Sequence, residues 1–287
     1  MSLSRDTTRQ FDRRLRLVAS VVDLDPRITE IRSKLDGFRA GAGQPVLDLL
    51  AQAVTSGEDT TVLFAAAVAE NTSTPAAHNA VVTGVRERLH AAIRSTYAAT
   101  ALDTYAAVAA QFDSAAKKLA AAHQAVDIEA SPELVLDLPD KPRRLWKDAP
   151  AMAADLARLS QVLTAAAVLA GICDDSDESV IALVVDAAEA NRRDLWAAWN
   201  IESTEAAAAR NARNNLPFTD SPLPTRSRCG RWSAMLRLGV RLRAHPADEP
   251  FTPYRRAMPM GIKITNGAAG PVRIQVDPED TIATKVT

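Results

Sequence analysis

Alanine is the sequence feature that most limits the folds open to this chain of 287 residues. It occurs 55 times, and 45 of these alanines lie between residues 51 and 212. Alanine loses no side-chain entropy in a helix and therefore leads the scale of helix propensity. It also buries little area, so helices rich in alanine must approach one another closely to form a core. The middle of the chain is therefore predicted to be helical and tightly packed.

Helix boundaries in the first part of the chain follow from apolar spacing and from prolines. Apolar residues at helical spacing predict a first helix near residues 4–22. Asp25 followed by Pro26 is typical of a helix start, with an N-cap and a proline at the first helical position. Another helix is predicted over about residues 60–70.

The longest predicted element covers residues 76–129, where no proline occurs. Its first half has an apolar stripe that steps by four residues, which predicts a bend. Its second half has a 3-4 repeat, which suits close antiparallel packing against another alanine-rich helix. The residues of this predicted helix-packing seam are Leu102, Tyr105, Ala109, Phe112, Ala116 and Leu119.

Prolines mark the next boundary. Four of them lie between residues 131 and 150, which predicts an irregular segment there. A helix is then predicted over 151–172, and a second long helix over about 178–213. The acidic residues of 174–178 are predicted to cap that second helix, since acids favour the positive end of a helix.

Beyond these helices the apolar period changes from 3.6 to 2 residues. Alternation over residues 236–242 predicts a half-buried strand with a basic outer face. Residues 260–265 and 272–276 also alternate, and the glycines between them predict a hairpin. Residues 282–286 are a further candidate strand.

These elements together predict a fold that is mainly α with a small C-terminal antiparallel β module (α+β), in which long Ala-rich helices pack as a bundle. The predicted organisation is a basic N-terminal helical arm over 1–43 and an Ala-rich helical domain over 44–215. The irregular segment 131–150 lies within this second part. A small basic β module over 216–287 follows.

Charge is unevenly distributed along the chain, although the formal net charge is only −1. Residues 1–40 and 221–287 are net basic, and residues 41–220 are net acidic. Such a chain is able to bind copies of itself end to middle, or to fold back on itself. Ordinary fluctuation around neutrality is the other interpretation.

Arginines are the best candidates for a binding surface. Residues 221–247 contain six arginines and no acidic residue. On a strand over 236–242, alternate arginines would form a row that suits phosphates or carboxylates. A protein partner, a nucleic acid and plain solvent exposure all stay open. The candidate partner-binding residues are Arg226, Arg228, Arg231, Trp232, Arg237, Arg241 and Arg243.

Two tryptophans form a second candidate contact surface. Trp196 and Trp199 lie three residues apart and therefore share one face of the predicted helix over 178–213. Core packing is one interpretation. A contact surface is the other, because tryptophan is enriched at binding hot spots.

Patterns for catalysis or metal binding are scarce. The four histidines do not pair at helical spacing, and Cys173 and Cys229 have no C-x-x-C partner. The sequence has no phosphate-binding glycine loop and no nucleophile elbow. We therefore expect no enzyme activity, no catalytic residues, no metal site and no cofactor. Two acids distant in sequence stay open as an acid–base pair.

The expected function is that of a structural, assembly-forming protein, whose partners are copies of itself and other structural proteins. The composition, rich in alanine, arginine, aspartate and valine, resembles that of actinobacterial proteins and those of their phages. This resemblance implies a virion component associated with a phage head or tail. The alternative function is a nucleic-acid-associated factor that binds through an arginine strand over 226–243.

The expected location is the cytoplasm or a virion, without a signal peptide. The N-terminal arginines have no apolar core behind them. The longest apolar-leaning uncharged run is 159–173, at 15 residues, whereas a membrane-spanning helix needs about 20. No membrane contact is therefore expected.

Overall fold

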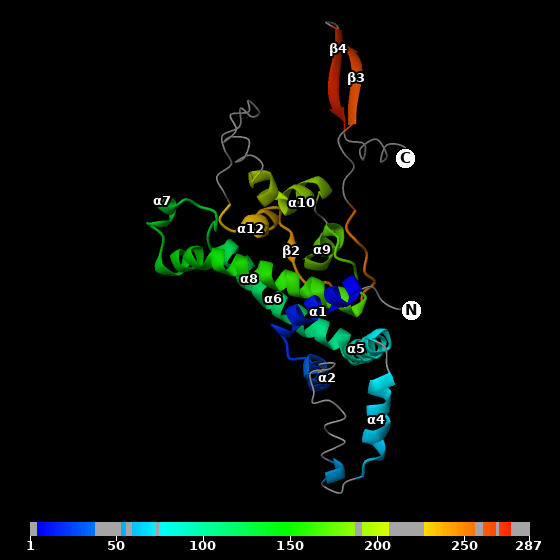
Figure 1. Ribbon diagram of the computed structural model, residues 1–287. Coiled ribbons are helices and arrows are strands. Elements are labelled where there is room, and N and C mark those ends of the chain that lie inside the picture. The colour runs from blue at the N-terminus through cyan, green and yellow to red at the C-terminus, as the bar shows by residue number, and fades with distance from the viewer. Residues whose placement is uncertain are drawn as a thin grey trace. The chain divides into compact units, whose positions relative to one another are not determined.

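The structure is a computed structural model that describes residues 5–37, 53–55, 59–72, 75–186, 191–206, 227–255, 261–267 and 270–276. Most of these residues are helical (Figure 1). The chain divides into two compact units, Met1–Thr104 and Tyr105–Thr287. The mainly α fold with a small antiparallel strand pairing is confirmed.

Helices build the first unit. They are α1 (Arg5–Ala19), α2 (Pro26–Gly37), α4 (Thr61–Thr72) and α5 (Pro75–Ala98), and α6 begins within this unit. Helix α2 packs against α5. Leucine, isoleucine, valine and tyrosine side chains of these helices are fully buried, because the apolar spacing puts them on one face of each helix. They are Leu15, Val18, Ile28, Ile93 and Tyr97.

The start of α2 confirms the capping prediction. Pro26 is its first residue, where a missing N–H costs no hydrogen bond. The Asp25 carboxylate accepts a hydrogen bond from the Arg27 N–H at 2.9 Å. This bond satisfies one of the N–H groups that have no partner in the first turn of a helix.

The predicted element over 76–129 is two helices in the structure. Helix α5 ends at Ala98, two turn residues follow, and α6 runs over Ala101–Ala125. The predicted bend is therefore a complete break, and the helical period restarts at Ala101.

The buried face of α6 follows the predicted seam with one exception. Tyr105, Phe112, Ala116 and Leu119 are buried, and Ala109 is half-buried. Leu102 is 55% exposed, so its assignment to the seam was wrong. It lies about 100° around the helix from Ala101, which is buried, because each residue turns a helix by that angle.

The second unit contains the remainder of α6 and shorter helices and strands. These are α7 (Pro132–Val135), α8 (Asp140–Ala170), α9 (Asp177–Val184), β1 (Val185–Asp186), α10 (Arg192–Trp199), α12 (Gly230–Arg237), β2 (Arg241–Leu242), β3 (Gly261–Gly267) and β4 (Gly270–Val276).

Helix α8 shows that the prediction of an irregular segment over 131–150 was wrong beyond Pro139. The helix starts at Asp140 and contains Pro142 and Pro150. Pro142 lies in the first turn, where backbone N–H groups have no intrahelical partner. Pro150 lies in the interior of the helix. The helix ends at Gly171, whose φ of 72° is favourable for glycine.

The second half of α8 is the most apolar part of the helix. Residues Asp140–Leu169 are long and apolar enough to cross a membrane, and half of the most apolar window is buried inside the protein. The buried side chains of this half include Leu156, Leu159 and Leu163. The apolar composition of this helix is thus largely used in packing.

The predicted long helix over 178–213 was also wrong. Ser176 caps α9 as the acidic loop predicts, by accepting a hydrogen bond from the Ser179 N–H. The helix then stops at Val184, because the two following residues pair with β2 as a short strand. Asn191 caps a new helix, α10.

The predicted strand over 236–242 was wrong for most of its length. Residues Gly230–Arg237 form α12, and Gly239, with φ 73°, turns the chain. Only Arg241–Leu242 is a strand, antiparallel to β1. The alternation of apolar residues and arginines therefore spans a helix end, a turn and a two-residue strand, and its arginines do not form one row.

The predicted hairpin is confirmed. Strands β3 and β4 are antiparallel and in register from Gly261 opposite Val276 to Gly267 opposite Gly270. They form a sheet separate from β1 and β2 among the described strands. The candidate strand over 282–286 lies outside the described residues.

The division of the chain at Thr104 falls inside α6. It does not coincide with the predicted boundaries near residues 43 and 215, and the three-part organisation stays a prediction. The packing of the long helices as one bundle also stays a prediction.

Candidate functional site

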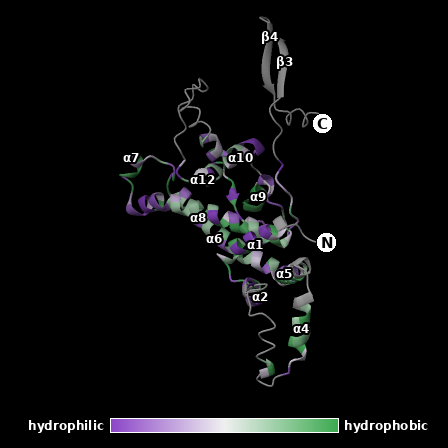
Figure 2. Cartoon of the chain, viewed as in Figure 1, coloured by the Kyte–Doolittle hydropathy of each residue, from purple (hydrophilic) through white to green (hydrophobic). Residues whose placement is uncertain are grey.

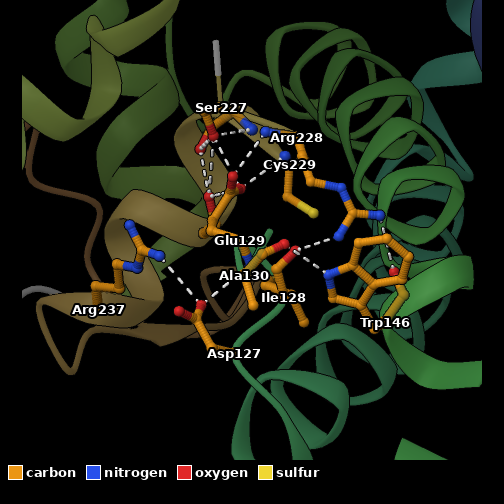
Figure 3. A network of polar contacts seen from close by, with 11 residues as sticks. Asp127, Ile128, Glu129, Ala130, Trp146, Ser227, Arg228, Cys229 and Arg237 are labelled. Carbon is orange, nitrogen blue, oxygen red and sulfur yellow. Dashed lines mark hydrogen bonds and ion pairs between the residues drawn. The ribbon is translucent and has the colours of Figure 1, made fainter. Parts of the chain in front are cut away.

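One carboxylate connects the loop after α6 to the start of α12 (Figure 3). Glu129 accepts hydrogen bonds from the hydroxyls of Ser227 at 2.9 Å and Ser233 at 2.7 Å. It also accepts from the backbone N–H groups of Arg228 at 2.7 Å and Cys229 at 2.8 Å. Cys229, the residue before α12, makes no side-chain cap. Glu129 therefore supplies a cap from 100 residues away.

These four hydrogen bonds decide the charge of Glu129. Burial alone would raise the pKa of the carboxyl group, because it disfavours the charged form. The donors from Ser233, Arg228 and Cys229 outweigh burial and hold the pKa of Glu129 below its ordinary value. The carboxylate is therefore an ionised, fully occupied acceptor rather than a proton donor.

Arg228 forms the second half of this site, against α8 (Figure 3). Its guanidinium lies over the Trp146 ring, 3.5 Å from the ring centroid. It donates hydrogen bonds to the carbonyls of Ile128 at 3.0 Å and Trp146 at 3.2 Å. The Trp146 ring N–H donates to the Ala130 carbonyl at 3.0 Å. Arg228 thus joins three segments of the second unit.

The bond to the Trp146 carbonyl explains how α8 tolerates Pro150. In a regular helix this carbonyl would accept from the N–H four residues later, and proline has none. The Arg228 Nη2 group donates to it instead, at 3.2 Å. An arginine distant in sequence therefore replaces the hydrogen bond that the proline removes.

The tryptophans of α10 and α12 lie mostly in the core. Trp199 and Trp232 are buried, and their rings meet edge to face at 6.3 Å. Arg231 lies over Trp199 at 4.5 Å and pairs with Glu202 at 2.9 Å. Trp196 is half-buried. Of the two tryptophans predicted as a contact surface, Trp199 is thus used in packing.

Three arginines of the candidate set are closer to the surface. Arg237 pairs with Asp127 at 3.1 Å, and Arg243 pairs with Glu249 at 3.4 Å. The Arg241 side chain is exposed and has no hydrogen bond or ion pair with any residue that the structure describes.

Most of the predicted binding arginines are therefore engaged within the chain. Arg228, Arg231, Arg237 and Arg243 each have an intramolecular partner. Arg226 lies outside the described residues. The structure brings Arg241 and Arg243 together at β2 and leaves Arg228, Arg231 and Arg237 elsewhere.

An open groove of about 500 Å³ lies between α6 and the segment around β2. Residues of α6 from Asp113 to Gln124 line one side, and Leu236 with residues 239–243 line the other. Its charged members are Asp113, Lys117, Arg241 and Arg243. We refer to this cavity as the α6–β2 groove. Its volume is in the range of small-ligand and peptide-side-chain sites.

The surroundings of the two thiols disfavour their thiolate forms. Burial raises the pKa of Cys173 to about 11 and that of Cys229 to about 12. A thiol reacts as its thiolate, so these shifts disfavour a nucleophilic role for either cysteine at neutral pH. No group of three or more metal-ligating side chains occurs among the described residues.

Sequence reasoning missed the residues that organise this site. Glu129 follows a helix end and Trp146 lies in a proline-rich stretch, and neither has a local pattern that marks its role. Their partners in residues 227–233 lie between 82 and 104 residues away. Ser227, just before α12, and Ser233, near the start of the helix, are the one available signal, because hydroxyls favour helix starts.

Comparisons with family models, with curated proteins and with solved structures found no match to this chain.

Proposed function

We propose that this protein is a structural, assembly-forming component that binds copies of itself through its strand edges and apolar helix surfaces. The observation that carries the proposal is the β3–β4 hairpin. It is a fully paired ribbon of two seven-residue strands that joins no other described strand.

A two-stranded ribbon has two open edges of unpaired N–H and C=O groups. Isolated ribbons are at best marginally stable in water, whereas three or more strands support one another. Pairing with a strand of a neighbouring copy satisfies these groups and stabilises the ribbon. The hairpin is therefore well suited to strand addition between copies.

Helix α4 supports the same proposal. Val62 is 78% exposed and Phe64 is 62% exposed on this helix. Figure 2 shows much of α4 in the green of apolar residues. Large apolar side chains exposed together mark interaction sites. We propose that copies also meet at this helix.

The specific form of this proposal is a virion component of an actinobacterial phage, in which long Ala-rich helices pack as a bundle. The composition supports the source. The buried alanines and leucines of α6 and α8 support the bundle.

The alternative, a nucleic-acid-associated factor, has less support. It relied on a row of arginines on one strand, and four of them have intramolecular partners instead. It predicts retention on DNA or RNA that falls steeply with salt. Replacement of Arg237, Arg241 and Arg243 by glutamine should abolish any such retention if this alternative holds.

The decisive experiment blocks the outer edge of β4. The two residues that flank a two-residue hairpin loop form a hydrogen-bonded pair, here Gly267 and Gly270. By alternation the N–H of Gln275 points to the outer edge. Pro271 lies four residues before Gln275, so its backbone nitrogen faces the same outer edge, and proline is compatible with this edge. Gln275→Pro should therefore remove an edge donor and keep the hairpin.

The measurement is sedimentation velocity of the full chain over a range of concentrations. We expect the wild type to form species larger than a monomer, and Gln275→Pro to lower their fraction. Gln275→Thr, which keeps the N–H, is the matched control and should behave as wild type. A wild type that stays monomeric at all concentrations and at low salt refutes the proposed function.

A further inference from the structure

The α6–β2 groove runs along the edge of β2 that faces away from β1, at the buried residue Leu242. In the β1–β2 pair, Leu242 lies opposite Val185, and the next residue, Arg243, donates its N–H to the Val184 carbonyl at 3.1 Å. Backbone groups alternate in direction along an antiparallel strand. The N–H and C=O groups of Leu242 therefore point away from β1.

The far side of β2 faces α6, as a single hydrogen bond shows. The backbone groups of Ala244 point the same way as those of Leu242, and the Ala244 N–H donates to the Asp113 carboxylate at 2.7 Å. Asp113 belongs to α6, so it occupies the acceptor position that a third strand would supply. Leu242 lies two residues before Ala244 and has no backbone hydrogen bond with any residue that the structure describes.

The rim of the groove is basic. Lys117 and Arg241 are exposed, and the half-buried Arg243 side chain makes a 3.4 Å ion pair with Glu249. Asp113 is the one acid of the lining, and the Ala244 N–H occupies its carboxylate. His123 also lines the groove, and its buried Nδ1 has no partner among the described residues. A ligand for this groove thus combines an extended backbone with carboxylates.

One segment of the chain has this combination in its sequence. Strand β4 ends at Val276, and Asp277, Glu279 and Asp280 follow directly. The acidic loop 174–178 does not qualify, because the Asp174 carboxylate and the Ser176 hydroxyl are engaged in capping α9. That loop cannot extend along a strand without losing its cap.

We propose that the α6–β2 groove binds the end of β4 and the acidic residues 277–280 of a second copy of this chain. The β4 backbone adds to the edge of β2 beside Leu242, and the carboxylates meet Lys117, Arg241 and Arg243. Strand addition provides the backbone pairing, and the opposite charges fix the direction and register. This inference rests on the proposed function and names the receiving surface for one strand edge.

The first test is a titration with a peptide of residues 272–282, labelled with fluorescein and followed by anisotropy on the full chain. We expect saturable binding that weakens as salt rises, because exposed charge pairs are screened. The double variant Lys117→Glu, Arg241→Glu should bind at least about tenfold more weakly, since charge reversal replaces attraction by repulsion. Both side chains are exposed, so the fold should persist, as far-UV circular dichroism would check.

Two controls separate this interface from plain charge attraction. Lys118→Glu makes the same kind of charge change one residue along α6, outside the groove lining, and should stay within about twofold of wild type. A peptide N-methylated at Gln275 keeps every charge and loses one backbone donor, and it should bind several-fold more weakly. The proposal is overturned if both peptides bind equally. It is also overturned if the Lys117→Glu, Arg241→Glu variant and the Lys118→Glu variant weaken binding equally.

The second test uses the full chain without peptide. Lys117→Glu, Arg241→Glu should reduce assembly in sedimentation velocity. Combination with Asp277→Lys, Glu279→Lys and Asp280→Lys in the same chain should restore it, because the charges are exchanged. If the wild type assembles and the groove variant assembles equally well, the groove proposal fails and the proposed function stands. If the wild type is monomeric, the proposed function fails, and absence of peptide binding then refutes the groove as well.

Discussion

At the scale of single residues, Glu129 shows how hydrogen bonds outweigh burial in setting a charge. Four donors converge on one carboxylate, and two of them are backbone N–H groups at a helix start. Such charge-assisted bonds are stronger than neutral ones. The residue therefore positions the start of α12.

Glu129→Gln tests this role. The amide cannot accept from all four donors, and it introduces an N–H₂ group among them. We expect the free energy of unfolding to fall by about 1–3 kcal/mol at neutral pH, the cost of unsatisfied buried partners. Urea unfolding measures it. Asp137→Asn makes the same carboxylate-to-amide change at an exposed residue nearby, and as the control it should leave stability unchanged.

The pH dependence of stability follows from the same carboxylate. The folded-state pKa of Glu129 lies below its ordinary value of 4.5. The group therefore stabilises the fold above about that pH, and this contribution is lost as the pH falls through the lowered pKa. Wild type should lose more stability than Glu129→Gln between neutral pH and acid. Equal pH profiles of the two proteins would contradict this assignment.

Arg228 and Pro150 form a coupled pair that a double-mutant cycle resolves. Pro150→Ala restores the helical N–H that reaches the Trp146 carbonyl, so the bond from Arg228 is no longer needed there. We expect Arg228→Met to cost about 1 kcal/mol less in the Pro150→Ala background than in wild type. Additive effects in denaturant unfolding would show that the two residues act independently.

At the scale of elements, two kinds of glycine position among the described residues can be compared. Gly239 and Gly171 have positive φ at helix ends, a conformation that costs other residues energy. Gly84 lies inside α5 with open space where a Cβ would be. The same substitution should therefore have opposite effects at the two kinds of position.

Gly239→Ala should destabilise the protein by about 1 kcal/mol, because nothing crowds the new methyl group and only backbone strain remains. Gly84→Ala should stabilise its helix by about 0.5–1 kcal/mol through helix propensity. Thermal unfolding followed by circular dichroism compares the two variants. A shift in the same direction for both would refute this reading of the backbone.

The elements that sequence predicted correctly are those fixed by local chemistry. The Asp25-Pro26 start, the end of α8 at Gly171 and the hairpin each depend on residues within a few positions. The start of α8 was missed because the carbonyl freed by Pro150 finds its donor in Arg228, 82 residues from Trp146. Helix α9 ends early because Val185 pairs with Leu242 across the chain. Sequence periodicity contains no information on such distant partners.

The candidate site was predicted by composition but not by geometry. The arginines were recognised as a cluster, yet a strand period placed them in a row. In the structure Arg228 and Arg231 lie over tryptophan rings, and among the described arginines of the set only the side chain of Arg241 lacks a partner within the described residues. Whether an arginine is free depends on which aromatic or acid the fold brings beside it.

At the scale of the whole molecule, exposed apolar surface on α4 should contribute to association between copies. Phe64→Ser replaces a ring that is 62% exposed, so it should leave the fold intact. We expect a lower fraction of assembled species in sedimentation velocity. Phe64→Leu keeps an apolar side chain and should assemble as wild type. An unchanged mass distribution for Phe64→Ser would remove α4 from the interface.

The large sequence separation between Glu129 and its donors has a consequence for the synthesis of this protein. The chain leaves the ribosome from its N-terminus, and the hydroxyl donors for Glu129 follow 98 and 104 residues later. Until then the carboxylate stays hydrated, and the Trp146 carbonyl beside Pro150 also waits for Arg228. A chain truncated before residue 227 therefore lacks the donors that complete its second unit. Cellular proteases should degrade such a chain quickly.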